Sequence, residues 1–540
     1  MFRARESLRD PGTFRAARSC RRLFLSVAVG FLVAEIVLRV AGVAPPPRLY
    51  RAVRGPDGAV RRIVSRVDGQ PLAVTEEFAQ AKAAGRLRLV FAGESTVAGY
   101  PYPPSVAFPS RFEAALHAVG ADVEALNVAA AGIPFEMSVE RVEEMMETDP
   151  DLLVLYAGSN EFLPYHLLRL RERLSMPLLV RLGALVRSFR TLRLLDRLLP
   201  ERGGPGEIPL HPSEEERCAA RAKLRDGAAR VAEACRRAGL PLLVFLPACD
   251  LSETVPIAGA TPWKSPEDEL KVREWLQEAS DRWRERNLAG ARSLLEDAAA
   301  LAPRHPWVHF SLGRVLLDLG ESVEARRELE RARDLDARPH RVTGDLRAIL
   351  AGVCAEHDLP TIDAQAVLDG ADPRGVAGAS LFVDPNHPTP EGQILLAGAL
   401  LEALAAGAAP KVGLDRDVLL DAVSRLAPAS LTAEDHERAR RTEATYLFPR
   451  AYRVGADAAL RGKVETLLEE GARRDPPEAA DLLLLGLLRL RRGDAEARDL
   501  LRRAVEADAL ASLDPGVLDA IGETPQSVRA SATEARREER

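Results

Sequence analysis

The sequence is poor in cysteine, lysine and aromatic residues, and it carries little net charge. Its five cysteines form no Cys-x-x-Cys pair and no Cys/His spacing typical of zinc, which argues against a metal site or a disulfide scaffold. The 74 basic and 80 acidic residues nearly balance, so the strong basic charge of a nucleic-acid-binding protein is missing and we expect no nucleic-acid partner. The stretch from Gly93 to Gly99 lacks the Gly-Lys-Ser/Thr of a phosphate-binding loop, and no cofactor is expected.

What is present fits a folded protein with several domains. Hydrophobic residues make up 46% and charged residues 29% of the 540 positions, which is typical of a chain with a buried core and argues against disorder. At roughly 100–200 residues per domain, this length predicts more than one folded unit.

One long apolar run lies near the N-terminus, at residues 23–44, and only Glu35 and Arg39 interrupt it. A run of this length suffices to cross a bilayer as a helix, and the two charges, four residues apart, can pair on one helical face. We therefore expect an uncleaved membrane anchor. The alternative is a cleaved signal peptide, which Pro45 disfavours because it directly follows the candidate cleavage site.

The charges that flank this run predict its orientation. Seven arginines precede it, which favours a cytoplasmic tail at residues 1–22 and places the rest of the chain on the periplasmic side of the inner membrane, as a single-pass protein. Arginines also follow the run, so the asymmetry is modest. Pro45 begins a polar, arginine-rich segment, residues 45–84, which we expect to be a linker.

Beyond this segment, short apolar runs alternate with helical stretches. The runs at 88–92, 123–128, 152–157 and 242–246 are typical of buried strands, and 361–363 is a short fifth. Strands separated by helices indicate a parallel sheet covered by helices on both faces. In such sheets the ligand crevice lies at the carboxyl ends of the strands, so the residues at those ends are the candidates for function.

Residues typical of acyl transfer follow these strands. Ser95 follows the first strand, Gly132 the second and Asn160 the third, and a loop far downstream contains Asp384 and His387. A serine hydroxyl attacks an ester only when a base takes its proton; His387 is the candidate base, and Asp384 could hold its imidazole in the correct tautomer. The backbone N–H groups of Ser95 and Gly132 and the side-chain amide of Asn160 could stabilise the oxyanion.

These segments, in this order, resemble the SGNH/GDSL hydrolase superfamily, whose namesake residues are Ser, Gly, Asn and His. The resemblance covers about residues 85–265 and 340–410. It implies an α/β fold, a flavodoxin-like three-layer α/β/α sandwich with a parallel sheet, and ester hydrolysis. The roles that it implies are nucleophile for Ser95, triad partners for Asp384 and His387, and oxyanion hole for Ser95, Gly132 and Asn160.

The sequence departs from the usual motifs of this family. Glu94 stands where Gly-Asp-Ser-Leu has Asp, and Glu161 stands where Gly-x-Asn-Asp has Asp. Both changes keep a carboxylate and make it one methylene longer, so they bear on loop packing rather than on the mechanism. A different interpretation takes Asp384 and His387 as two metal ligands, although no third ligand is evident nearby.

The segment 266–339 repeats itself with a shift of 34 residues, which aligns small residues such as Ala279 and Gly313 where two helices would touch. This period resembles the tetratricopeptide repeat, and it implies a helical insertion that binds a protein partner. A similar hairpin is expected in a helical C-terminal region, residues 411–525, before a disordered tail, residues 526–540. The alternative is that these are amphipathic helices that only pack on the core.

Residues 163–200 are rich in leucine and arginine at helical spacing, and we expect a helical lid over the site; the alternative is a helix pair on an anionic membrane surface. The whole sequence predicts a membrane-anchored serine esterase that hydrolyses acyl esters, such as acetyl esters, of envelope carbohydrate or lipid. The same triad would serve an O-acyltransferase. From another class, the alternative is a non-catalytic scaffold whose repeats bind assembly partners.

Overall fold

The computed structural model of the chain describes residues 30–37, 39–40, 50–54, 60–64, 77–79, 81–162, 212–426, 432–451, 458–474, 477–491, 494, 496–506 and 526. The chain forms two units, one of Met1–Arg48 with Pro164–Pro209 and one of Leu49–Leu163 with Leu210–Arg540. The expected lid at 163–200, and the expected tail at 526–540 apart from its first residue, lie outside the described residues.

In the first unit, residues 30–37 and 39–40 are helical. The Arg39 side chain donates a hydrogen bond to Glu35 at 2.8 Å, which is the pairing that their spacing predicts. Among the described residues, no helix combines the length and the apolar character needed to cross a bilayer.

Five parallel strands form the central sheet of the second unit, in the order β5-β4-β6-β7-β8. This is the strand order of a flavodoxin-like sheet, in which ligands bind at the carboxyl ends of the strands where the order reverses, here β4 and β6. The five strands expected from the sequence are confirmed. They are β4 (Leu87–Gly93), β5 (Val123–Asn127), β6 (Leu152–Tyr156), β7 (Leu242–Leu246) and β8 (Thr361–Asp363).

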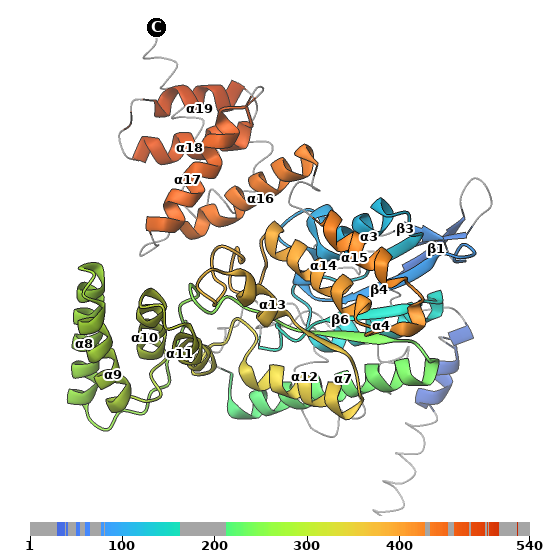
Figure 1. The fold of residues 1–540 in the computed structure, drawn as a ribbon, viewed down its shortest axis with the longest axis horizontal. Helices are drawn as coiled ribbons and strands as arrows, with labels where there is room; N and C mark the ends of the chain where they lie inside the picture. Colours follow the sequence, from blue (N-terminus) through green and yellow to red (C-terminus); the bar gives the residue numbers. More distant parts are fainter. Residues whose placement is uncertain are drawn as a thin grey trace, which may run out of the picture. The chain divides into compact units, whose positions relative to one another are not determined.

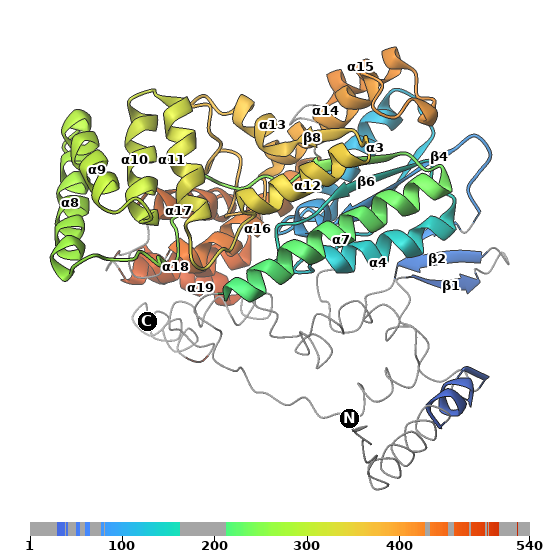
Figure 2. The ribbon, with the colours of Figure 1, turned by 90° about the horizontal axis from the view of Figure 1, so that it is seen from below.

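Helices cover both faces of this sheet (Figures 1 and 2). Alternate side chains of β4, β5, β6 and β7 enter the two hydrophobic cores. In β4, Val90 and Ala92 belong to one core, whereas Leu89 and Phe91 belong to the other. The expected three layers are therefore present, and we call residues 81–162, 212–262 and 337–426 the sheet domain. The first face carries α4 (Phe135–Met145), α7 (Glu214–Ala238) and α12 (Gly344–Glu356), and the second carries α3 (Phe108–Ala118), α13 (Ala364–Ala371), α14 (Pro390–Ala405) and α15 (Arg416–Arg425).

The segment expected to be a linker, residues 45–84, contains a small antiparallel sheet instead. Its strands are β1 (Tyr50–Arg54), β2 (Val60–Val64) and β3 (Glu77–Ala79), in that order. The many arginines make this stretch look like a polar linker. The valine and isoleucine residues between them have the β-branched side chains that favour strands, and this signal decides the local structure.

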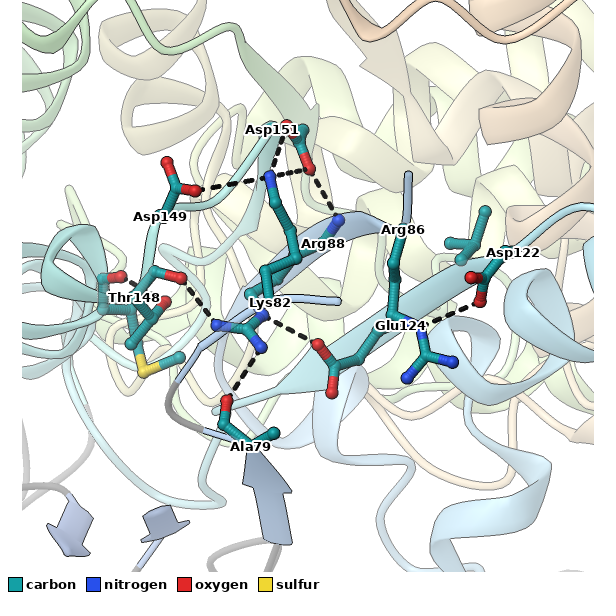
Figure 3. A network of polar contacts seen from close by, with 12 residues as sticks. Ala79, Lys82, Arg86, Arg88, Asp122, Glu124, Thr148, Asp149 and Asp151 are labelled. Atoms are coloured by element: carbon teal, nitrogen blue, oxygen red, sulfur yellow. Dashed lines mark hydrogen bonds and ion pairs between the residues drawn. The ribbon is translucent and has the colours of Figure 1, made fainter. Parts of the chain in front are cut away.

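A network of polar contacts around Arg88 ties the small sheet to the start of β4 (Figure 3). The Arg88 side chain, 1% exposed, donates to the backbone oxygens of Ala79 and Thr148 at 2.9 and 2.6 Å and to the Glu124 carboxylate at 2.7 Å. A buried guanidinium is tolerated when its donors are paired in this way. The contacts hold β3 at the amino end of the central sheet, opposite the edge that carries the candidate site.

Two helical hairpins form the insertion between β7 and β8 (Figure 1). Small residues lie where their helices touch, as expected: Ala279 is buried, and a Cβ atom on Gly313 would come within 2.6 Å of the Leu329 side chain. The insertion shares a hydrophobic core with the first face of the sheet domain. Its helices are α8 (Pro266–Arg284), α9 (Leu288–Leu301), α10 (Pro306–Asp318) and α11 (Ser322–Asp334).

Four further helices, which we call the C-terminal helices, contribute most of a third, leucine-rich core. This core also includes Tyr102, Val106 and Val383 of the sheet domain. Because Val383 directly precedes Asp384, the C-terminal helices pack against the loop that carries two of the candidate site residues. They are α16 (Ala433–Ala451), α17 (Ala458–Ala472), α18 (Ala479–Arg491) and α19 (Ala497–Glu506).

Candidate active site

Ser95 lies just beyond the end of β4, at the start of the short helix α2 (Ser95–Ala98). The strand ends at Gly93, where a Cβ atom would lie 2.1 Å from the backbone oxygen of Tyr156 in the neighbouring strand. Glycine alone allows this close approach, so the chain can turn sharply after the strand. The turn places Ser95, which is 7% exposed, at the carboxyl edge of the sheet.

The imidazole of His387 lies between Ser95 and Asp384. Its Nε2 is 2.7 Å from Oγ of Ser95, and its Nδ1 is 2.6 Å from Oδ2 of Asp384. The other carboxylate oxygen of Asp384 accepts the backbone N–H groups of Asn386 and His387, at 2.8 and 2.9 Å. The structure therefore brings together a serine and a histidine that are 292 positions apart, with the aspartate held by the backbone of its own loop.

The surroundings of Asp384 favour its ionised form. Burial by itself raises the pKa of this carboxyl group, but the charge of His387 and the hydrogen bonds from His387, Tyr446 and the Asn386 backbone outweigh it. The pKa of Asp384 therefore lies well below its usual range. An ionised carboxylate on Nδ1 keeps a proton on that nitrogen, so Nε2 faces the serine hydroxyl as an acceptor.

Gly132 and Asn160 belong to two loops that contact each other. The buried side-chain amide of Asn160 donates to the backbone oxygen of Ile133, the residue after Gly132, at 3.0 Å. Gly132 has a φ of +71°, a left-handed conformation that glycine adopts without strain. The two loops follow β5 and β6, which flank β4, so they lie at the same edge of the sheet as Ser95.

Two glutamates, to which sequence reasoning gave no role, hold these loops in place. The carboxyl oxygens of Glu94 accept the backbone N–H groups of Gly158 and Ser159, at 2.7 and 3.0 Å. Glu161 accepts the backbone N–H of Phe135 at 2.8 Å. Glu94, the residue before Ser95, thus binds the loop after β6 through both oxygens of its carboxyl group.

Both carboxyl groups have raised pKa values. Burial and, to a smaller extent, the nearby Glu161 raise the pKa of Glu94, the backbone N–H groups lower it, and the net value is about 8. Burial also raises the pKa of Glu161, to about 7. The loop that carries Asn160 is therefore tied to the turn that carries Ser95 through a group that titrates near neutral pH.

Two tyrosines that sequence reasoning missed adjoin the histidine and the aspartate. Tyr446 of α16 donates its hydroxyl to Oδ2 of Asp384. The ring of Tyr100 lies edge-on to His387 and to Tyr446, with ring centroids 5.0 and 5.5 Å apart. No motif marks either residue, and Tyr446 lies 62 positions beyond Asp384 in a region expected to be a separate helical unit, so the sequence offered no signal for it.

The interpretation of Asp384 and His387 as metal ligands requires a third ligand. In the part of the chain that the structure describes, no three His, Cys, Asp or Glu side chains are grouped so that they could hold a metal ion. The two side chains instead face each other, and His387 also faces Ser95.

Residues 282–344 match the family model of the tetratricopeptide repeat. The insertion carries a tetratricopeptide repeat. The matched stretch runs from the last turn of α8 to the start of α12, so the repeat period read from the sequence is confirmed, and we call α8–α11 the TPR insertion.

The chain is also similar to solved structures of GDSL-like lipases and acylhydrolases. One is a GDSL-like lipase from Bacteroides thetaiotaomicron, with 11% identity and a TM-score of 0.29; the similarity covers 61% of this chain and 92% of the lipase. A lipase/acylhydrolase from Enterococcus faecalis has 14% identity and a TM-score of 0.28, with 59% and 95% covered. A member of the lipolytic protein G-D-S-L family from Veillonella parvula has 12% identity and a TM-score of 0.26, with 59% and 97% covered. No similar sequence was found among curated proteins.

Proposed function

We propose that the protein is a serine ester hydrolase of the SGNH type, with Ser95 as nucleophile, His387 as general base and Asp384 as the residue that orients the base. The observation that carries the proposal is the continuous hydrogen-bonded path from Ser95 Oγ through the imidazole to Asp384, with contacts of 2.7 and 2.6 Å. Hydroxyl, imidazole and carboxylate in this order are what nucleophilic attack on an ester requires.

The reaction begins when Nε2 of His387 takes the hydroxyl proton as Ser95 Oγ attacks the ester carbonyl. The imidazolium that forms is stabilised by the Asp384 carboxylate. His387 then gives the proton to the leaving alcohol, the C–O bond breaks, and an acyl-serine remains. Water attacks this acyl-enzyme with His387 again as base, which releases the carboxylic acid and restores Ser95.

The tetrahedral intermediates carry a negative oxygen that needs fixed donors. We assign this role to the backbone N–H groups of Ser95 and Gly132 and to the side-chain amide of Asn160. The hydrogen bond from Asn160 to Ile133 joins the two loops, and the bonds from Gly158 and Ser159 to Glu94 join the Asn160 loop to the turn that carries Ser95. They support the assignment, because they fix both loops relative to Ser95 before substrate binds.

Replacing Ser95 tests this proposal. We expect Ser95→Ala to lower the hydrolysis of p-nitrophenyl acetate by at least about 10³-fold and to abolish labelling by a fluorophosphonate probe, since the attacking oxygen is gone. Ser424→Ala, which removes an exposed serine on α15, is the matched control and should retain both activities. Full activity or labelling of Ser95→Ala would reject the assignment.

We further propose that the chain is anchored in the inner membrane by residues 23–44, with the catalytic domain in the periplasm and with acyl esters of envelope carbohydrate or lipid as substrates. The apolar run and its arginine-rich flank support this placement. The exposed Cys218 offers a test. A membrane-impermeant maleimide should label it in intact spheroplasts and should not label Cys218→Ser at that site; labelling only after lysis would place the domain in the cytoplasm.

For the TPR insertion we propose a protein partner. A pocket on this insertion is lined by apolar side chains and by side chains of both charges; its lining includes Leu312, Leu316, Arg292, Arg327, Glu296 and Glu324. We expect the exchange of charges in Arg327→Glu/Glu324→Arg to abolish the pull-down of a membrane-fraction protein that the unmodified chain retains. Equal retention by both proteins would contradict this binding site.

A further inference from the structure

The carboxylate of Asp384 is bound on both oxygens. Oδ1 accepts two backbone N–H groups of its own loop, and Oδ2 faces His387 Nδ1 and accepts the hydroxyl of Tyr446. The side chain is 5% exposed, so water has little access to it. If the Tyr446 hydroxyl is removed, water does not readily replace it as a donor to Oδ2. The negative charge on that oxygen then interacts with the imidazole of His387 alone.

Tyr446 belongs to α16, and this helix is tied to the sheet domain by contacts on the same face. The Ser105 hydroxyl lies 2.6 Å from Oδ1 of Asp435, and the Tyr102 hydroxyl lies 3.1 Å from Oε2 of Glu443. Along α16, Glu443 lies 8 residues and Tyr446 lies 11 residues after Asp435, which is close to two and three turns of helix. One face of α16 therefore supplies all three contacts. The position of the Tyr446 hydroxyl is thus fixed by a helix rather than by a mobile loop.

The ring of Tyr100 packs against both the imidazole of His387 and the ring of Tyr446. It is inclined at 67° to His387 and at 87° to Tyr446, which is the edge-to-face packing that aromatic rings prefer. Burial raises the pKa of Tyr100, and the charge of Asp384 raises it further, so the Tyr100 hydroxyl stays neutral in the working range. The packing restricts rotation of both neighbouring rings.

From this geometry we infer that the C-terminal helices complete the catalytic site: Tyr446 is a positioning residue that acts through Asp384 and keeps His387 aligned with Ser95. The inference rests on the proposed ester hydrolysis, and it extends the site beyond the sheet domain. The Tyr446 hydroxyl and the imidazole of His387 both interact with the negative charge of Asp384. Because Tyr446 belongs to α16, this helix fixes the direction from which the hydroxyl approaches.

The charged and titratable groups around Asp384 come from several elements. His387 lies on the same loop, Tyr100 and Tyr102 lie on the segment after α2, and Tyr446 lies on α16. Tyr102 in turn faces two glutamates, Glu443 of α16 and Glu391 of α14, and the first of these pairs with Lys463.

Tyr446→Phe in the full chain tests the inference, because it removes the hydroxyl and keeps the ring that packs on Tyr100. Without this donor, the Asp384 charge stabilises the protonated imidazole more strongly. The acid limb of the pH profile of kcat/KM should therefore move to higher pH, by about half a pH unit. Loss of alignment should lower kcat about tenfold with little change in KM.

Ser105→Ala is the matched control. It removes another contact between α16 and the sheet domain without touching Asp384, so a merely structural role of Tyr446 would give the same result in both variants. We expect Ser105→Ala to leave the acid limb where it is in the unmodified protein. An unshifted acid limb in Tyr446→Phe, or the same shift in both variants, would overturn the inference.

A measurement without substrate separates this inference from the proposed function. The proton between His387 Nδ1 and Asp384 gives a low-field NMR signal in histidine-labelled protein, and Tyr446→Phe should move it further downfield as that hydrogen bond strengthens. If the unmodified chain proves inactive on esters, the hydrolase proposal is wrong, and this signal still decides whether Tyr446 acts on the aspartate. An unchanged signal overturns the inference whatever the activity.

Discussion

The buried carboxyl group of Glu94 predicts a pH dependence of stability that can be measured directly. Its pKa is raised by burial to about 8 in the fold, against an ordinary value of 4.5 in the unfolded chain. Between these two values the unfolded chain has lost its proton while the folded chain keeps it. The free energy of unfolding therefore falls as the pH rises, by up to about 1.4 kcal/mol per pH unit for this one group.

From pH 5 to pH 8 this slope amounts to a loss of up to about 4 kcal/mol. Glu94→Gln removes the titrating group. The glutamine amide has one oxygen, so it can accept only one of the N–H groups of Gly158 and Ser159, and its NH2 group faces the other. An unsatisfied N–H costs about 1–3 kcal/mol at every pH. The variant should therefore be less stable than the unmodified protein at pH 5 and more stable at pH 8.

Urea denaturation at pH 5, 6, 7 and 8, followed by far-ultraviolet circular dichroism, provides the free energies. Glu402→Gln, which removes an exposed carboxylate on α14, serves as the control and should track the unmodified protein. Glu161, with a pKa of about 7, leaves some pH dependence in all three proteins. Parallel curves for Glu94→Gln and the unmodified protein, with no crossing between pH 5 and 8, would refute the assignment of this slope to Glu94.

Two further predictions concern the loop that carries Asn160 and the TPR insertion. Asn160→Ala should lower kcat on an ester by about 10²–10³-fold with KM nearly unchanged, because the proposed amide donor to the negative oxygen of the intermediate is lost; a change confined to KM would contradict this role. Gly313→Ala should destabilise the insertion by about 1–3 kcal/mol, because the new Cβ would lie 2.6 Å from the Leu329 side chain. Tryptophan fluorescence measures this effect selectively, since all four tryptophans lie between Trp263 and Trp307, and an unchanged unfolding midpoint would contradict it.

The sheet and the residues at its carboxyl edge could be predicted because their signals are local. Buried parallel strands are continuous apolar runs, so 242–246 matches β7 residue for residue. The range 361–363 also matches β8, although only Ile362 of that strand is buried. The topology of such a sheet then brings the ends of neighbouring strands together. That rule places Ser95 and Asn160 at one edge without any knowledge of side-chain contacts.

The rest of the site depends on contacts that leave no mark in a sequence. Tyr446 reaches Asp384 only because α16 packs on the sheet domain, and nothing in its own helix distinguishes it from a core tyrosine. Glu94 is visible in the sequence as a departure from the motif around Ser95, but its raised pKa comes from burial beneath a loop more than 60 positions away, which the motif does not show. The small sheet of β1–β3 was missed for another reason, since abundant arginine concealed the β-branched residues of its strands.

The order of the site residues along the chain has a consequence for how the protein is made. Of the site residues, Ser95 leaves the ribosome first; the whole TPR insertion is made before the loop that carries His387, and the helix that carries Tyr446 follows that loop. Contacts between such distant segments form late in folding, because the loop between them must first be ordered. If the protein is the hydrolase that we propose, a nascent chain therefore exposes the Ser95 hydroxyl before its base has been made, and hydrolysis cannot begin before the His387 loop has been synthesised and folded.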